Sequence, residues 1–517
     1  MGFLPVLSPD QSSAWDTRAV ADGIALATLM ETAGRAVAAV LADRYAPRLR
    51  EGVLIATGPG HNGGDGWVLA RALHRLDVPV WVTPAQSGGA ELQLAMQARA
   101  RAEGVREVAA DGPWPAAGLV VDALLGTGAK GAPRAPMAAL LERLLDLELP
   151  VLAIDGPTGL DLLTGVVHGA ARADLTVTFG GLRRGHLLAR DEVGDLIVVD
   201  IGHPAADPSL PSLVTDGQAA GWLPRIRARD HKGDRGRVVI VGGHSGMAGA
   251  ARMAGRAAFG AGAGLVHAVA PADTIAALVA AEPDLQTFTH PLDRPPTPEL
   301  LELVGRADAL VIGPGLGRDP GRRALITTLV GAARAAVLDA DALVAFQGAT
   351  EELRALADAR PIVLTPHPGE FRTLFPTVAP KRELDPWAAA SEAADSVGAV
   401  VLLKGVPTVI ARTGRPPLTV AAGNPGLATG GSGDVLSGLV GAALAQGVQP
   451  EIAAALGAQA LGRAADLAAR RSAARTLRPM DVVAALPDLW REWELLALAP
   501  PLARPPVLLE LVRPLTV

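Results

Sequence analysis

The chain has 517 residues, of which 49% are hydrophobic and 19% charged, and its formal net charge is −6. This length is more than one ordinary hydrophobic core accommodates, so we expect two or more domains. The composition is typical of a globular chain and excludes a mainly disordered one. The negative net charge argues against a large nucleic-acid interface. The absence of cysteine excludes disulfides and thiolate metal sites.

The first residues, MGFLPVLSPD, lack the basic and apolar regions of a signal peptide. Asp and Arg interrupt the apolar stretches too often for a membrane span. The ten histidines show no HExxH or His-x3-His pairing, which argues against a zinc site. We therefore expect a cytoplasmic protein with no membrane partner and no nucleic-acid partner.

The first half of the chain alternates apolar strands with helical patterns, which predicts an α/β fold. Gly34 lies in the middle of the helical pattern of residues 22–45 and predicts close packing against another element. A strand at residues 53–56 leads through GPGHNGGDG, residues 58–66, into a helix. Strand, glycine turn and helix form phosphate sites in α/β folds. The spacing is neither GxGxxG nor a P-loop, and an ordinary strand–helix turn is the alternative.

Polar residues follow the apolar strands of this half at their C-terminal ends. Asp122 and Asp155 end two such strands, and Asn62 and Thr158 follow in neighbouring turns. Because ligands of open α/β sheets bind at the carboxyl ends of the strands, we expect these side chains to converge on one crevice. Side-chain and backbone oxygens suit a hard cation. Each Asp taken alone is equally consistent with a loop cap.

The regular pattern lapses between about residues 203 and 229, which predicts a linker or domain edge before a second α/β half. Near the end of that half, residues 424–438 read NPGLATGGSGDVLSG. This glycine turn precedes an apolar helix, whose N-terminus favours an anion such as phosphate. Asp434, in the first turn, is placed to act as a general base. A flexible glycine turn is the alternative.

Several single residues have structural interpretations beside the functional ones. We interpret Asp339 and Asp341 as helix caps rather than a metal pair. His367, between two prolines, is by itself more typical of a structural hydrogen bond, and Lys404 follows an apolar strand either as a solvated lysine or as a phosphate contact. Residues 496–517 predict a proline-rich tail or an arm that packs on an edge.

Longer motifs resemble two known families. GPGHNGGDG, DALLGTG and DGPTGLD resemble the N-terminal domain of NAD(P)H-hydrate epimerase. HKGDRGRVVIVGGHSGMAGAA, IGPGLG, TPHPGEF, KGVPTVI and NPGLATGGSGDVLSG resemble ADP-dependent NAD(P)H-hydrate dehydratase, of the ribokinase-like superfamily. The resemblance implies a Rossmann-like three-layer α/β domain at residues 1–215, a ribokinase-like α/β domain at 225–495, and a tail at 496–517.

The resemblance also implies repair of hydrated nicotinamide nucleotides. The first half would interconvert the R and S epimers of NADH hydrate and NADPH hydrate. The second half would phosphorylate the S epimer from ADP, so that phosphate leaves, AMP remains and the ring is restored. Potassium, Mg²⁺ and a homo-oligomer are implied as well. The alternatives are a ribokinase-like kinase of a vitamin precursor and a non-catalytic N-terminal binding module.

For the epimerase half, the resemblance implies Asp155 as the acid/base and potassium on Asn62, Asp122 and Thr158. The implied substrate residues are His61, Asn62, Gly63, Gly64, Asp65, Gly126, Thr127, Gly128, Ala129, Lys130, Gly131, Ala132 and Asp155. For the dehydratase half, Asp434 is the implied base. The implied substrate residues there are Ala250, Gly315, His367 and Asp434, and the implied nucleotide and anion residues are Lys404, Gly405, Val406, Pro407, Thr408, Gly430, Gly431, Ser432 and Gly433.

The chain departs from the family pattern at four places. His61 stands where the family has the first of two asparagines, and Thr158 stands where it has serine. Arg183 replaces a lysine, which keeps the charge and changes the geometry. Leu461 replaces a histidine before Gly462. These departures affect the implied epimerase site more than the implied dehydratase site.

Overall fold

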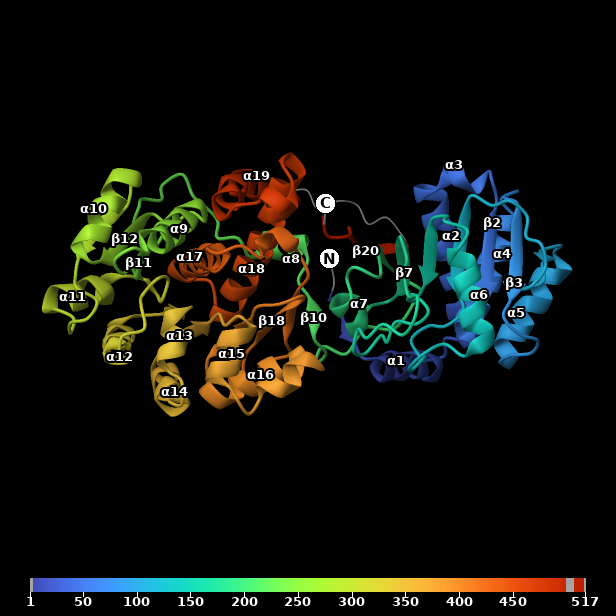
Figure 1. Ribbon diagram of the computed structural model, residues 1–517, viewed down its shortest axis with the longest axis horizontal. Coiled ribbons are helices and arrows are strands. Elements are labelled where there is room, and N and C mark those ends of the chain that lie inside the picture. Colours follow the sequence, from blue (N-terminus) through green and yellow to red (C-terminus); the bar gives the residue numbers. More distant parts are fainter. Residues whose placement is uncertain (1–2, 499–505, 516–517) are drawn as a thin grey trace. The chain divides into compact units, whose positions relative to one another are not determined.

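A computed structural model of the chain describes residues 3–498 and 506–515. The described residues form two compact units. We call residues 3–210 with residues 506–513 the N-terminal unit, and residues 211–498 the C-terminal unit. Both units combine parallel β-sheet with helices, which confirms the expected α/β fold (Figure 1). The boundaries at residues 215 and 225 stay a prediction.

The N-terminal unit is built on one sheet of eight strands among the described residues. Neighbouring strands are parallel except at one edge, where β20 runs antiparallel to β9. The inner strands are apolar without alternation because both faces are covered. The order is β20 (Val507–Leu511), β9 (Asp195–Val199), β7 (Leu175–Phe179), β6 (Val151–Ile154), β5 (Leu119–Ala123), β2 (Val53–Thr57), β3 (Val80–Pro84) and β4 (Arg106–Glu107).

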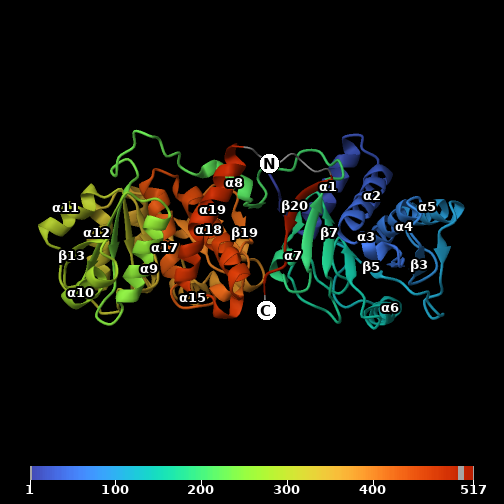
Figure 2. The ribbon, with the colours of Figure 1, turned by 90° about the horizontal axis from the view of Figure 1, so that it is seen from above.

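Helices cover both faces of this sheet, so the unit has three layers (Figure 2). Helices α2, α4 and α5 pack on one face and α6 on the other. A separate two-stranded pair joins β1 (Val6–Leu7) to β8 (Leu182–Arg183). The helices are α1 (Pro9–Ala21), α2 (Leu26–Arg44), α3 (Ala46–Leu49), α4 (His61–His74), α5 (Glu91–Ala102), α6 (Ala135–Leu145) and α7 (Arg184–Leu188).

Glycines in α2 and α4 bring these helices close to their neighbours. A Cβ on Gly34 would lie 2.5 Å from Cβ of Val68, which confirms the close packing predicted for this glycine. The predicted glycine loop is shorter than expected, because α4 already begins at His61. Gly63 and Gly66 therefore lie inside the helix. A Cβ on Gly63 would clash with the carbonyl oxygen of Gly58, so this glycine serves the contact with the strand end.

The C-terminal unit contains a sheet of ten strands among the described residues. Seven neighbouring strands are parallel, namely β13, β12, β11, β14, β15, β16 and β17. Strands β18 and β19 add an antiparallel hairpin beside β17. The order is β10 (Ser212–Leu213), β19 (Leu418–Val420), β18 (Thr408–Ala411), β17 (Val400–Leu403), β16 (Ile362–Leu364), β15 (Ala336–Leu338), β14 (Ala309–Ile312), β11 (Arg237–Val241), β12 (Leu265–Ala270) and β13 (Gln286–Thr289).

The largest core of this unit lies between the sheet and the helices α8, α9, α17, α18 and α19. In Figure 1, α13 to α16 lie on the other side of the sheet. The helices are α8 (Asp216–Trp222), α9 (Ala248–Gly260), α10 (Ala272–Ala281), α11 (Pro298–Arg306), α12 (Arg322–Ala332), α13 (Asp341–Ala345), α14 (Thr350–Ala359), α15 (Pro368–Leu374), α16 (Pro386–Val397), α17 (Ser432–Ala445), α18 (Pro450–Arg471) and α19 (Pro479–Leu498).

The predicted linker at residues 203–229 contains regular structure, since β10 and α8 both lie in it and belong to the C-terminal unit. For residues 496–517 the structure favours the predicted arm that packs on an edge over a tail, because this segment contains the end of α19 and the edge strand β20. No single helix in the described ranges is long and apolar enough to cross a membrane, although α1 and α2 pass that test as a pair bent by 120°.

Candidate functional site

The predicted residues of the N-terminal unit gather where the strand order reverses. From β2 the chain continues to β3 on one side, and it later returns to β5 on the other side of β2. Asp122 lies in β5, Asp155 directly follows β6, and Asn62 lies in the first turn of α4. A Cβ on Gly126 would lie 2.8 Å from Oδ2 of Asp155 and 3.2 Å from Oδ1 of Asn62. The structure therefore brings these side chains together at a topological switch point, as expected for an α/β ligand site.

Asp155 is held in an unusual backbone conformation by its neighbours. Its φ is 66°, a region that residues other than glycine seldom adopt. Thr127 donates to Oδ2 of Asp155 from its backbone N–H at 2.6 Å and from its hydroxyl at 2.5 Å. Thr178 donates to Oδ1 at 3.2 Å, and the guanidinium of Arg183 lies 3.4 Å from the same oxygen. The carboxylate is therefore fixed in position before any ligand binds.

These contacts set the charge of Asp155. Burial alone would raise its pKa, but the charge of Arg183 and the hydrogen bonds from Thr127 outweigh burial and hold the pKa of Asp155 below its usual range. Arg183 also donates to the hydroxyl of Thr127 at 3.0 Å. The arginine that replaces the family's lysine thus contacts both the carboxylate and the residue that orients it.

His186 belongs to the same network and was not singled out from the sequence. Its Nδ1 accepts from the backbone N–H of Arg183 at 3.0 Å, so Nε2 carries the hydrogen that is donated to the carbonyl oxygen of Asp155 at 2.7 Å. Burial lowers the pKa of His186 to about 4, and the ring is therefore neutral at physiological pH. It fixes the strained peptide of Asp155.

The predicted cation ligands form a second group in this crevice. The carboxylate of Asp122 accepts from the hydroxyl of Thr158 at 2.8 Å and from its backbone N–H at 2.7 Å. The side-chain oxygen and nitrogen of Asn62 are buried and have no hydrogen-bond partner among the described residues. Buried polar groups are almost always paired, so the side-chain oxygen of Asn62 fits the oxygen ligands that a hard cation takes.

Other predicted residues of this unit lie in different environments. His61 is exposed, and the loop residues Gly128, Lys130, Gly131 and Ala132 are also exposed. Asp65 is buried, and burial together with the charges of Asp155 and Asp16 raises its pKa well above the usual range. Asp65 is thus a buried carboxyl within α4, whereas His61 at the start of the same helix is exposed.

In the C-terminal unit the chain also reverses its strand order, between β11 and β14. Lys404, directly after β17, lies 2.7 Å from Oδ1 of Asp339, which follows β15. The hydroxyl of Thr365, after β16, donates to the same oxygen at 2.8 Å. The interpretation of Asp339 as a helix cap is wrong, because its carboxylate instead pairs with Lys404. Asp341 does not cap α13 either, and it accepts from the N–H of Gly317 at 2.9 Å.

The glycine turn before α17 meets this charged pair. Gly431 adopts φ 103° at the N-cap, where no side chain caps the helix. The amide of Ser432 donates to the carbonyl oxygen of Thr429 at 3.3 Å, and the uncapped helix N-terminus favours an anion. A Cβ on Gly433 would lie 3.1 Å from Nζ of Lys404 and 3.5 Å from Oδ2 of Asp339. The predicted anion turn and the predicted lysine therefore face each other.

Asp434 lies in the first turn of α17 with an unusual affinity for protons. Burial, and then the negative charges of Asp339 and Asp341, raise its pKa to about 7, while Lys404 opposes the shift. A carboxylate with this pKa exchanges protons near neutral pH, which suits a general base. Burial also raises the pKa of Glu370 in the neighbouring α15.

The predicted substrate residues lie at the same ends of the strands. Ala250 and Gly315 touch, since a Cβ on Gly315 would lie 3.0 Å from Cβ of Ala250. His367 makes the structural hydrogen bond that its position between two prolines predicted. Its Nδ1 accepts from the N–H of Gly369 at 2.9 Å and caps α15. Its ring is half exposed, and its Nε2 lies 3.2 Å from Oε1 of Glu370.

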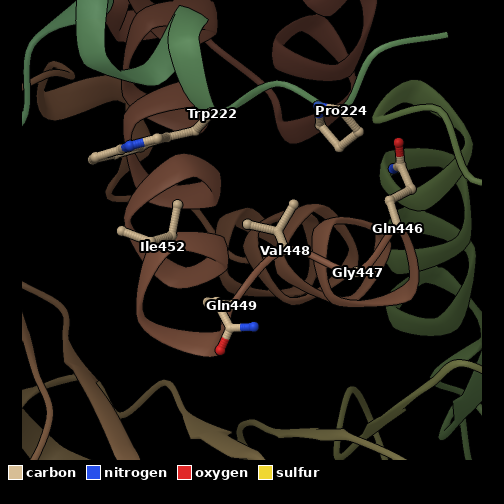
Figure 3. A pocket seen from close by; sticks show the side chains of 7 residues that line it. All are labelled: Trp222, Pro224, Gln446, Gly447, Val448, Gln449 and Ile452. Carbon is tan, nitrogen blue, oxygen red and sulfur yellow. The ribbon is translucent and has the colours of Figure 1, made fainter.

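The predicted nucleotide loop follows β17. The hydroxyl of Thr408 donates to the carbonyl oxygen of Gly405 at 3.2 Å and closes the turn, while Val406 is 71% exposed. A pocket elsewhere in the unit is lined by Trp222, Pro224, Gln446, Gly447, Val448, Gln449 and Ile452 (Figure 3). It adjoins the C-terminal end of α17, whereas Asp434 lies at the N-terminal end, and no predicted site residue lines it.

Comparison with known proteins decides the family. A family described as NAD(P)H-hydrate dehydratase matches residues 238–488, and one described as the N-terminus of YjeF-related proteins matches residues 26–185. The bifunctional NAD(P)H-hydrate repair enzyme of Escherichia coli is 37% identical over 476 residues, which cover 90% of this chain and 89% of that protein. The chain belongs to the family of bifunctional NAD(P)H-hydrate repair enzymes.

Other members of this repair-enzyme family agree. The bifunctional NAD(P)H-hydrate repair enzyme of Moorella thermoacetica is 36% identical over 90% of this chain and 92% of its own length. Among solved structures, an ADP/ATP-dependent NAD(P)H-hydrate dehydratase from Bacillus subtilis, co-crystallised with ATP and Mg²⁺, covers 54% of this chain and 98% of its own. Its identity is 27% and its TM-score 0.48. The two bifunctional relatives confirm the family resemblance read from the motifs.

Proposed function

We propose that this chain repairs hydrated NADH and NADPH by two reactions. The N-terminal unit epimerises the R and S hydrates, and the C-terminal unit dehydrates the S hydrate at the expense of ADP, giving AMP and phosphate. The observation that carries the proposal is the position and proton affinity of Asp434. This residue lies in the first turn of α17, whose uncapped N-terminus faces Lys404, and its pKa is raised to about 7.

The geometry of the C-terminal unit supports attack of a hydroxyl group on a phosphoryl group. Asp434 in its ionised form accepts the proton of the substrate hydroxyl. The uncapped N-terminus of α17 and the ammonium of Lys404 stabilise the negative charge that spreads over the transferred phosphoryl group. We assign the substrate to Ala250, Gly315 and His367. We assign the nucleotide to the loop from Lys404 to Thr408 and to the glycine turn at residues 430–433. When bound, Mg²⁺ would neutralise the charge of the phosphates.

The geometry of the N-terminal unit supports proton transfer by Asp155. Its carboxylate is ionised at neutral pH, because its pKa is held low, and it is positioned by Thr127 and Arg183. It acts as the acid/base near the reacting carbon of the hydrated ring, where it accepts and returns the proton of the hydroxyl group. We assign substrate contacts to residues 61–65 and to the loop at residues 126–132. A cytoplasmic location and a homo-oligomer stay predictions from the sequence and the family.

The test uses purified full-length protein with mixed NADH-hydrate epimers, K⁺, Mg²⁺ and ADP, and follows the return of the reduced-nicotinamide absorbance. Complete recovery, faster than spontaneous epimerisation allows, supports both reactions. Recovery that stops when the S epimer is exhausted contradicts the epimerase assignment. No recovery with ADP or ATP would instead support the alternative, a kinase of a vitamin precursor in the same superfamily.

The proton affinity of Asp434 predicts the pH profile of dehydration. Because the base acts in its ionised form, kcat/KM should rise about tenfold per pH unit below pH 7 and level off above it. Asp339→Asn removes a negative charge beside Asp434, so the inflection should move to lower pH. Initial rates with the pure S epimer measure this. A profile that is flat through neutral pH would contradict the assignment of the base.

The unpaired amide of Asn62 predicts a potassium site with Asp122 and Thr158. A bound ion would supply a fixed positive charge beside Asp155. Asn62→Leu should raise the K⁺ concentration needed for half-maximal epimerisation by at least about tenfold, with dehydration unchanged. The exposed neighbour gives a control, since His61→Asn should keep the K⁺ response. The rates are measured against KCl at constant ionic strength, and equal K⁺ responses of the two variants would remove this assignment.

A further inference from the structure

The strand β20 closes one edge of the N-terminal sheet, although it follows the whole C-terminal unit in sequence. It pairs antiparallel with β9 and joins Val507 to Val199 and Leu511 to Leu196. Figure 1 shows it in red beside the green strands near β7. Without β20, the main chain of β9 would be an open sheet edge, which native proteins normally keep covered. We call residues 506–513 the C-terminal arm.

Charged side chains anchor the C-terminal arm on both sides. The guanidinium of Arg44, at the end of α2, contacts the carboxylate of Glu510. The backbone N–H of Arg513 donates to Asp195 at 2.8 Å, and its guanidinium donates to the carbonyl oxygen of Asp174 at 2.7 Å. These contacts go to particular side chains, so the arm is recognised by sequence as well as by strand pairing.

Arg190 is a buried anchor whose partners come from the arm. It is 6% exposed, and burial lowers its pKa to about 10. Its Nη2 donates to the carbonyl oxygens of Leu511 at 3.5 Å and Val512 at 3.1 Å, while Nε and Nη1 have no partner among the described residues. A buried guanidinium needs acceptors, so Arg190 depends on the arm as much as the arm depends on Arg190.

The anchors connect the arm to the segments that carry Asp155. The carboxylate of Asp174 accepts from the N–H of Val151 at 3.0 Å, at the start of β6, and β6 ends directly before Asp155. Arg190 follows α7, whose His186 donates to the carbonyl oxygen of Asp155. Loss of the arm would therefore release both segments that hold the strained carboxylate.

We propose that the edge of β9 is a binding site for the chain's own C-terminal arm, and that occupancy of this site controls the epimerase reaction. The residues that follow the dehydratase half thus complete the epimerase half. This inference rests on the epimerase activity proposed above. Binding of the arm is measured separately from catalysis, so the two proposals can fail independently.

The first experiment compares the full chain with a chain that ends at Pro505. Epimerisation should fall by at least about tenfold, because small displacements of a catalytic group cost that much or more, while dehydration of the S epimer should be unchanged. A synthetic peptide of residues 506–515, PVLLELVRPL, should bind the shortened chain in calorimetry and restore epimerisation saturably. Full epimerase activity of the shortened chain, or no binding of the peptide to a folded shortened chain, would overturn the proposal.

A matched pair of substitutions in the full chain covers the case in which the shortened chain does not fold. Val507 packs against the core of the N-terminal unit, whereas its neighbour Leu508 is 41% exposed. Val507→Glu should lower the epimerase rate, and Leu508→Glu should leave it unchanged. Equal rates for the two variants would overturn the proposal.

A dilution series tests whether the arm comes from the same chain. The epimerase rate per mole of full-length protein should not change on dilution, because an arm from the same chain stays attached at any concentration. A specific rate that falls as the protein dissociates in size-exclusion chromatography would overturn this part and assign the arm to a second copy.

Discussion

Asp434→Asn should lower the rate of dehydration by about 10²- to 10⁴-fold, the usual contribution of a general base, and leave epimerisation at the wild-type rate. Asparagine keeps the size and polarity of the side chain at the first turn of α17 but cannot accept the proton. The measurement is the return of reduced-nicotinamide absorbance from the pure S epimer with ADP and Mg²⁺, beside interconversion of the epimers without ADP.

Asp481 gives a matched control for this variant. It also lies in the first turn of a helix of the C-terminal unit, α19, but it is exposed, and its carboxylate accepts from the N–H of Arg478 at 2.9 Å. Asp481→Asn should dehydrate the S epimer at the wild-type rate. If Asp434→Asn also kept that rate, the base would have to be another group, and the mechanism proposed here would be wrong.

Asp155→Asn should give the opposite pattern, with epimerisation reduced by about 10²- to 10⁴-fold and dehydration of the S epimer unchanged. Asparagine tolerates the positive φ of this position better than alanine does, so the variant tests the carboxylate rather than the backbone. Its amide cannot hold the negative charge that Arg183 faces. The R-to-S conversion is followed by chromatographic separation of the epimers.

Asp77 is the matched control for Asp155, because it is an exposed aspartate of the N-terminal unit with φ 57°. Asp77→Asn should epimerise at the wild-type rate. Unchanged R-to-S conversion in Asp155→Asn would remove Asp155 from the reaction. A loss of dehydration in the same variant would mean that the two units are coupled in a way that the proposal does not contain.

Much of the candidate site could be predicted because parallel strands end at one edge. Asp122 and Asp155 end apolar runs that are adjacent in the sheet, and their convergence with Asn62 followed from that rule alone. Asp434 was predicted because a glycine turn and an apolar run are adjacent in the sequence, and the helix does begin there. Local patterns and strand topology thus suffice for the residues that lie on strand ends and helix starts.

The remaining features depend on contacts between distant segments. Asp339 lies 65 residues from Lys404, so their pairing has no local signal. His186 lies in a helix of five residues, α7, which is too short for a periodic pattern. Strand β20 lies in a proline-rich stretch, and its side chains alternate only weakly between more and less exposed positions. The segment is a strand because it pairs with the edge of β9. A search for titratable residues after the apolar run that ends at Phe179 would have returned His186 together with Arg183 and Arg184.

The position of β20 also has a consequence for how the protein is made. Arg513 and Asp195 are in contact although 318 residues separate them. At the usual rate of synthesis the ribosome takes roughly tens of seconds to cover that distance. During this time β9 emerges without its partner, while the segments of the dehydratase half are still being added. Only a chain translated to its end can close the sheet, so an interrupted product carries an exposed strand edge by which chaperones and proteases can distinguish it.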